Sequence, residues 1–390
     1  MFYDKQSKKE QEDYKNMLSI IGSYSLLFSE SDVPYLYYRC HENIFCKYFN
    51  ADNLSREDSS ADAKKNKIGI GLKTWVGNDD QKVAEFNKLR PTYAKLEGLE
   101  LVKKIAEYRN ARIQFTKNSH GLQEMIYHII KRKPGVMKIV EHTFDEIDID
   151  NIKLLNNSKA KENNIYFTDG KHTYHFSLSK NTLYMIFKDL VEMDEIPIDI
   201  LADPYRELEK INKKNEKSIS AVSMKKCATS GATPFTVNTS HKLQLCLRLY
   251  SVSQGKKFVA EKSGLNQWNA CGRKRNPNEL YIPYPSEDRK RIIDFFPNRE
   301  ECFELLLPDG QVISAKVCQD SGKAIMSNPN KVLGEWLLRK VFCLKEGELL
   351  TYDTLLKCNV DSVIFTKLGD LKYSIDFATL GTYEEFYGIE

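Results

Sequence analysis

The feature that most constrains the fold is a polar stretch near the middle of the chain, residues 203–232. It is rich in Lys, Ser, Asn and Glu and poor in large apolar residues, so it cannot bury enough apolar surface to join a core. Of the 390 residues, 202 precede this stretch and 158 follow it (390 − 232), and each part is long enough for a domain of its own. The sequence therefore predicts two domains, 1–202 and 233–390, joined by a polar linker over 203–232.

The N-terminal part changes its hydrophobic period along the chain. The run Lys67–Trp75 alternates like a strand, with Ile68, Ile70 and Leu72 on one face and Gly69, Gly71 and Lys73 on the other. Asp79 and Asp80 before Pro91 are typical of a short helix over 79–89. Apolar spacings of three and four predict further helices over 14–28, 35–49 and 99–115. Strands are expected at 137–142 and 147–155, and a hairpin at Asp169-Gly170. This mixture predicts an α+β fold.

The C-terminal part is expected to be mostly strands. Leu243, Leu245, Leu247 and Leu249 alternate with polar and small residues, as in a strand with one buried face. Turn residues at 308–310 and 368–370 predict two hairpins. One helix is predicted over 331–342, where apolar residues recur at helical spacing.

A basic, amide-rich stretch, Ser263–Pro285, carries the strongest functional signal. Between Lys256 and Arg299 there are ten Lys or Arg and five Asp or Glu, a net charge of +5 in a chain whose total is +4. A focused basic patch is typical of a surface that meets phosphate. Asn, Gln and Arg are also the side chains that read base edges in the major groove. Taken alone, the stretch is equally consistent with a solvated loop whose Asn residues cap turns.

Together with residues 315–338, this stretch resembles the C-terminal domain of NgoFVII-type restriction endonucleases, a B3-like DNA-binding pseudobarrel similar to those of BfiI and EcoRII. The resemblance covers about residues 235–377. It implies a mostly-β barrel that grips double-stranded DNA with two arms, 266–278 and 319–330. In the first arm it implies DNA contacts by Asn266, Gln267, Asn269, Arg273 and Arg275. In the second it implies contacts by Lys323, Ser327, Asn328 and Asn330, although Asn330 is alternatively a helix cap.

The N-terminal domain then needs residues that could hydrolyse a phosphodiester. That reaction is commonly catalysed by clustered carboxylates that hold Mg²⁺ and by a cation near the attacking water. The candidates are Glu42, Asp62, Lys73 and Glu85, with Asp62 and Glu85 as the metal ligands. The glycine face of the strand is expected to leave room beside Lys73 for a metal and a phosphate. The alternative is that these are ordinary surface residues at a strand end and on an amphipathic helix.

The spacing of Asp62 and Lys73 resembles the PD-(D/E)XK nuclease core, in which an acid stands two residues before the lysine. That position is Gly71 here, which departs from the pattern. Some restriction enzymes of this class carry the acid on the following helix, where Glu85 is expected. Glu42 would be the acid of the first helix, which supports the metal or the scaffold. The segment 107–115 also resembles this restriction group, and its Arg109, Asn110 and Arg112 are expected either to contact phosphate or to face solvent.

Other nuclease classes and cofactors are excluded by absent motifs. None of the seven His residues has a Lys two places later, which excludes the phospholipase-D type of nuclease, and no phosphate-binding GxxxxGK[ST] loop is present. There is neither a long apolar run nor a signal peptide, which predicts a cytoplasmic protein that does not cross a membrane.

The resulting hypothesis is a Mg²⁺-dependent type II restriction endonuclease. A cognate DNA methyltransferase is expected in the same system, with other restriction subunits or a homo-oligomer as further partners. The alternative is a non-catalytic DNA-recognition subunit of a multi-subunit restriction system such as BsuMI, which the chain also resembles.

Overall fold

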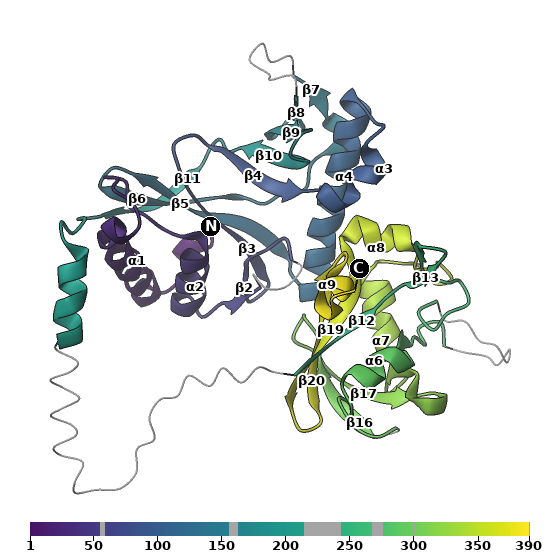
Figure 1. The fold of residues 1–390 in the computed structure, drawn as a ribbon. Coiled ribbons are helices and arrows are strands. Elements are labelled where there is room, and N and C mark those ends of the chain that lie inside the picture. Colours follow the sequence, from purple (N-terminus) through teal and green to yellow (C-terminus); the bar gives the residue numbers. More distant parts are fainter. Residues whose placement is uncertain (55–58, 156–162, 214–242, 267–275, 300, 390) are drawn as a thin grey trace, which may run out of the picture.

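The computed structural model of the chain describes residues 1–54, 59–155, 163–213, 243–266, 276–299 and 301–389. Two sheets with covering helices form the N-terminal part, and a third, larger sheet forms the C-terminal part (Figure 1).

A six-stranded mixed sheet is the centre of the N-terminal domain. Its strand order is β1-β2-β3-β5-β6-β11, and β3 and β5 are its one parallel pair. The helix α4 connects those two strands, as parallel strands require a crossover. The predicted strand over 67–75 is confirmed as β3. The bounds are β1 Asp52–Asn53, β2 Ala63–Lys65, β3 Ile68–Val76, β5 Glu124–Lys133, β6 Val136–Thr143 and β11 Val191–Pro197.

Helices cover both faces of this sheet because its strands are apolar on both sides. On one face, α1 (Lys8–Ser23) and α2 (Tyr38–Tyr48) pack Tyr14, Leu18 and Phe45 against Ile70 and other inward residues. On the other face lies α4 (Gly98–His120). Ser7 and Glu10 form a capping box that begins α1 several residues before the predicted start at 14. The helices predicted over 35–49 and 99–115 are confirmed.

A second, antiparallel sheet packs beside α4, in the order β4-β10-β9-β8-β7. Two predictions fail here. The segment predicted as a helix over 79–89 is β4, followed by a 3-10 turn at Asn87–Leu89 and the short α3 at Arg90–Tyr93, because residues 80–85 pair with 182–186 about a hundred positions later. The strand expected over 147–155 is a 3-10 turn at Ile149–Asn151 and a two-residue strand. The bounds are β4 Asp80–Glu85, β7 Lys153–Leu154, β8 Asn164–Thr168, β9 Thr173–Ser177 and β10 Thr182–Ile186.

The C-terminal domain is a sheet-rich, near-barrel structure of seven strands. Their order is β12-β19-β20-β16-β17-β18-β15, with β16 and β20 as the parallel pair. Both predicted hairpins, β16–β17 and β19–β20, are present. The strands are β12 Gln244–Arg248, β15 Ile282–Pro283, β16 Cys302–Leu306, β17 Val312–Cys318, β18 Ala324–Ser327, β19 Val360–Gly369 and β20 Lys372–Thr379, with a separate hairpin of β13 Ser251–Ser253 and β14 Lys256–Phe258.

Short helices surround this sheet. The helix predicted over 331–342 is present as α7 (Val332–Gly334) and a continuing π-helical segment, Glu335–Val341. Its Leu333, Trp336 and Leu337 lie in the core, as their spacing predicted. The remaining helices are α6 Ser286–Arg291, α8 Tyr352–Cys358 and α9 Thr382–Tyr387.

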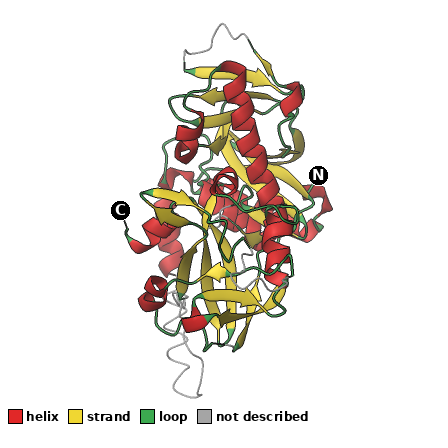
Figure 2. Cartoon of the chain, turned by 90° about the vertical axis from the view of Figure 1, so that its right-hand side faces the viewer, coloured by secondary structure: helices red, strands yellow, loops and turns green. Residues whose placement is uncertain are grey.

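The long helix α4 joins the two domains physically. It runs from the second sheet to the C-terminal domain (Figures 1 and 2). Near its end, Phe115 is buried in the C-terminal core, with its ring centroid 4.8 Å from that of Phe377 and 5.8 Å from that of Phe342. In the other direction, Leu380 is buried in the N-terminal core. Of the predicted linker, residues 204–213 are helical and residues 214–232 lie outside the described residues.

Candidate active site and DNA interface

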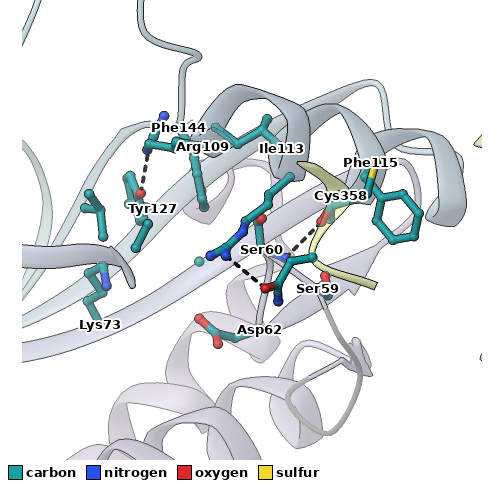
Figure 3. A pocket seen from close by; sticks show the side chains of 16 residues that line it. Ser59, Ser60, Asp62, Lys73, Arg109, Ile113, Phe115, Tyr127, Phe144 and Cys358 are labelled. Carbon is teal, nitrogen blue, oxygen red and sulfur yellow. Dashed lines mark hydrogen bonds between the residues drawn. The ribbon is translucent and has the colours of Figure 1, made fainter. Parts of the chain in front are cut away.

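A pocket opens between α4, the strand β3 and the corner that joins α8 to β19 (Figure 3). The N-terminal domain supplies most of its wall, and Cys358 and Asn359 come from the C-terminal domain. Two of the predicted catalytic residues, Asp62 and Lys73, line it. The other lining residues are Ser59, Ser60, Gly71, Val83, Ala84, Arg109, Arg112, Ile113, Phe115, Thr116, Tyr127 and Phe144.

Asp62 stands just before β2, where the antiparallel pairing of β2 and β3 holds it against the middle of β3. Its backbone N–H donates to the carbonyl of Ile70 over 2.9 Å, and its Oδ2 accepts from the backbone N–H of Leu72 over 2.7 Å. Burial raises the pKa of this carboxyl, while the Leu72 hydrogen bond and the Lys73 and Arg39 cations act in the opposite direction. The carboxylate is thus oriented by backbone and set among cations.

Lys73 lies on the same face of β3 as Gly71. Its Nζ donates to the carbonyl of Lys82 on β4 over 2.8 Å and lies 5.7 Å from the ring centroid of Tyr127. Burial lowers the pKa of the Lys73 ammonium, the charges of Lys82 and Arg109 lower it further, and Asp62 raises it. An ammonium held this way keeps further N–H donors for a bound anion or water.

The space in front of Gly71 is filled, which corrects the expectation of an open glycine face. Gly71 is the register partner of Tyr127 on β5, and the Tyr127 ring lies over it, stacked on Phe144 at 4.1 Å between centroids. A Cβ at position 71 would come within 2.9 Å of Tyr127 and 3.0 Å of Phe144. The acid that the nuclease pattern places here is therefore excluded by an aromatic ring.

The two glutamates predicted for the site lie elsewhere. Glu85 ends β4 instead of standing on a helix, does not line the pocket, and binds Lys82 and Asn87. Glu42 on α2 is 5 % exposed and accepts from Arg39 Nη1 over 2.7 Å. The Arg39 charge also lowers the pKa of Asp62. Glu42 is therefore linked to the pocket through Arg39 and does not line it.

The described pocket wall offers few protein ligands for a metal ion. Within the described ranges, no group of three His, Cys, Asp or Glu side chains could hold a metal ion, and Asp62 is the single carboxylate of the pocket wall. Mg²⁺ is often held by one or two carboxylates together with waters and substrate phosphates. The pocket fits that open arrangement, with Asp62 as the protein ligand, and does not fit a cage of several carboxylates.

In the first predicted DNA arm, Asn266 is bound within the domain. Its Nδ2 donates to the carbonyls of Ala260 and Leu350 over 3.1 and 3.0 Å, and its Oδ1 accepts from the Leu350 N–H over 2.7 Å. The amide therefore anchors the start of the arm and could reach a base only by losing these bonds. The far end is anchored by Arg339, which donates to Pro277 and Asn278. Gln267, Asn269, Arg273 and Arg275 lie outside the described residues.

The second arm divides into buried and exposed members. Ser327 is fully buried, and its hydroxyl donates to the Pro329 carbonyl and accepts from the Leu333 N–H, both over 2.8 Å. Asn330 Nδ2 donates to Glu279 over 2.8 Å. The Ser327 hydroxyl therefore holds the turn into α7, and a contact between Ser327 and DNA would require the loss of these bonds. Lys323 and Asn328 are exposed and remain candidates for DNA contact.

Several cations between Lys256 and Arg299 are also bound by other groups of the domain. Lys257 bridges Asp361 and Glu384, Arg291 lies near Asp288, and Arg289 donates to the Tyr284 carbonyl. Of these three cations, Lys257 alone is paired with described acids outside the window 256–299, because Asp288 is already counted in the net charge of +5 and a carbonyl partner does not neutralise Arg289.

Comparison with known families bears on this domain. Residues 237–368 match the model of the NgoFVII C-terminal B3-like DNA-binding domain. The C-terminal domain is similar to a restriction-enzyme DNA-binding domain. The seven-stranded near-barrel sheet of the C-terminal domain fits the match, and the match supports DNA as a partner and a relation to restriction enzymes. It covers about a third of the chain (132 of 390 residues) and leaves the N-terminal domain outside. No curated protein matches the chain.

The membrane prediction has its own test. Across the described residues, no helix combines the length and the apolar character that a membrane span needs.

Tyr127 and Asn359 are two of the pocket-wall residues that sequence reasoning did not find. Tyr127 gave no signal because its role depends on lying over Gly71, a contact between strands 56 positions apart. Asn359 reaches the pocket only through the packing of one domain on the other. Arg109 and Arg112 did give a signal, since they are three positions apart on a helix and so share a face.

Proposed function

We propose that the protein is a site-specific type II DNA endonuclease that hydrolyses phosphodiesters of double-stranded DNA at a short recognition sequence, in defence against foreign DNA. One observation carries the proposal. Asp62 and Lys73, predicted as a catalytic pair, line one pocket at the border with the B3-like domain. A nuclease site beside a DNA-binding domain is what cleavage at a defined position requires.

In this proposal Lys73 orients the attacking water and stabilises the charge that develops on the phosphate, since its N–H donors face the pocket. Asp62 would hold Mg²⁺, which would supply Lewis-acid activation of the phosphate and of the attacking water. Glu42 orients Arg39 beside Asp62. Water attacks the phosphorus in line and the 3′-oxygen leaves, so the product carries a 5′-phosphate.

Alanine variants of the two central residues test the proposal. Asp62→Ala and Lys73→Ala should abolish cutting of supercoiled plasmid in Mg²⁺ and leave specific DNA binding intact, because the B3-like domain is unchanged. Lys104→Ala, on the same domain but away from the pocket, serves as the matched control and should cut normally. Chelation of Mg²⁺ should stop the wild-type reaction. If both pocket variants still cut, the proposed active site is wrong.

A second candidate is a DNA-recognition subunit that has no nuclease activity of its own. Among the described residues, Asp62 is the one carboxylate of the pocket wall, and this favours the second candidate, since Gly71 and Glu85 do not supply a second carboxylate. Purified protein would then bind unmethylated DNA of mixed sequence and leave it uncut with Mg²⁺. Addition of other subunits of the system would be needed to restore cleavage.

Both candidates imply the same setting. Host DNA must be protected at the recognition sequence, so we propose a cognate DNA methyltransferase as a partner in the same system, acting in the cytoplasm. Cutting both strands would need either a homo-oligomer or other restriction subunits.

A further inference from the structure

Arg109 is a buried cation that has no counter-ion among the residues that the structure describes. The residue is 3 % exposed, and none of the ion pairs formed among the described residues joins its guanidinium to a carboxylate within 4.0 Å. Nη1 donates to the Asp145 carbonyl over 2.6 Å, Nη2 donates to the Tyr127 hydroxyl over 3.3 Å, and Nε is buried without a hydrogen-bond partner. A buried, unpaired charge is costly. Its retention beside a cavity indicates an anionic ligand.

The described wall of the pocket around Arg109 is cationic. Among the described residues it holds Lys73, Arg109 and Arg112 against Asp62, a formal net charge of +2 (3 − 1). Arg112 is fixed by donation from Nη1 to the Glu85 carbonyl over 2.7 Å and from Nη2 to Asn359 Oδ1 over 2.9 Å. Clefts lined by one sign of charge concentrate ligands of the other sign.

The neighbouring Asn110 contrasts with Arg109, because its hydrogen bonds are all made within the protein. Its Nδ2 donates to the Ile147 carbonyl and its Oδ1 accepts from the Ile147 N–H, both over 2.8 Å. Both ends of the amide are therefore used to hold the loop after β6. Arg109 and Arg112, three positions apart, lie on the pocket side of α4.

We propose that this pocket is an anion subsite for a phosphodiester group, with Arg109 and Arg112 of α4 as its binding residues. Guanidinium groups suit this ligand because their planar N–H donors match two phosphate oxygens at once. Tyr127, packed on Gly71, holds Arg109 across the cavity from Lys73. The inference rests on the proposed function for the identity of the ligand, a DNA phosphate next to the bond that is cut.

The test measures binding without cleavage. The full-length protein is titrated with dimethyl phosphate at constant ionic strength, and binding is followed by calorimetry and by NMR of the arginine Nε–H signals. Arg112→Gln should weaken binding at least tenfold, which is about 1.4 kcal/mol. Arg109→Lys keeps the buried charge and removes the planar fork, so it should weaken binding less. Lys104→Gln, at a half-buried cation of the same helix that pairs with Glu107 and does not line the pocket, should bind as the wild type does.

The same variants give a second readout on non-specific DNA. Removing one phosphate contact lowers the slope of log affinity against log salt by about 0.9, so Arg112→Gln should show this drop and Lys104→Gln should not. The subsite is refuted if dimethyl phosphate does not bind, or if Arg112→Gln and Arg109→Lys, both folded, bind it as the wild type does. Cleavage that survives Asp62→Ala would overturn the proposed nuclease and leave these binding results standing.

Discussion

The candidate pocket and the second predicted arm of the C-terminal domain both carry polar side chains, but these side chains differ in how far the protein itself satisfies their hydrogen bonds. In the arm, the Ser327 hydroxyl donates and accepts within its own turn, and Asn330 donates to Glu279. In the pocket, Lys73 and Arg109 make one or two hydrogen bonds each and keep further donors. The comparison teaches that a polar residue is available for a ligand only when the protein has not already satisfied it.

Position 71 offers the strongest test of the pocket. Gly71→Asp restores the acid of the nuclease pattern but forces a Cβ against the Tyr127 and Phe144 rings. We expect the free energy of unfolding to fall by about 3 kcal/mol, because overpacking and a buried carboxylate both cost stability. Chemical denaturation measures this loss. Gly369→Asp is the matched control, since no atom lies within 4 Å of a Cβ there. A stable Gly71→Asp variant that cuts faster would show that the site accepts a second acid.

Ser327 and Lys323 separate stability from DNA contact within one arm. Ser327→Ala leaves the buried Leu333 N–H without an acceptor and should lower the unfolding free energy by about 2 kcal/mol. The affinity of the folded variant for DNA should stay the same. Lys323→Ala should weaken DNA binding and leave the unfolding free energy unchanged. The side chain is exposed, and the contact of this residue with Tyr284 is made by its backbone carbonyl, which the substitution keeps. Gel-shift and denaturation measurements on both variants decide. Weaker DNA binding by a fully stable Ser327→Ala would assign the hydroxyl to recognition.

The stability of the protein should fall in acid because of His120, the last residue of α4, which lies near Pro308 and Asp309 of the C-terminal domain. Burial and the nearby Lys64 charge lower the pKa of His120 to about 4. A histidine whose pKa is depressed in the folded state contributes its full stability above the unfolded pKa, near 6.5, and loses it as the pH falls toward 4. The loss should reach about 1 kcal/mol at pH 5.5. Melting curves of wild type and His120→Gln compared from pH 7.5 to 5.5 isolate this contribution, and parallel curves would contradict it.

Much of the fold was predictable because it depends on local pattern. The alternation of Lys67–Trp75 and the helical spacing of 35–49 and 99–115 identify β3, α2 and α4, and turn residues identify both C-terminal hairpins. The pattern failed where pairing over a long range decides the outcome. Residues 79–89 carry helix-start and helix-stop signals, yet β4 pairs with β10 from residues 182–186. Because this pairing makes residues 80–85 a strand, Glu85 does not lie on a helix and does not line the pocket.

For the site, residue types and spacing along the chain suggested Asp62 and Lys73, which line one pocket. The DNA-binding character of the C-terminal part came from its resemblance to a known domain, because residue types alone were equally consistent with a solvated loop. Three things depended on the tertiary structure: Tyr127 fills the space before Gly71, Asn266 and Ser327 serve the scaffold, and Asn359 closes the pocket from the other domain. The physical reason is common to all three. Contacts between residues far apart in the chain decide which side chains are available to a ligand and which residues enclose the pocket. The sequence pattern does not encode which side chains will meet.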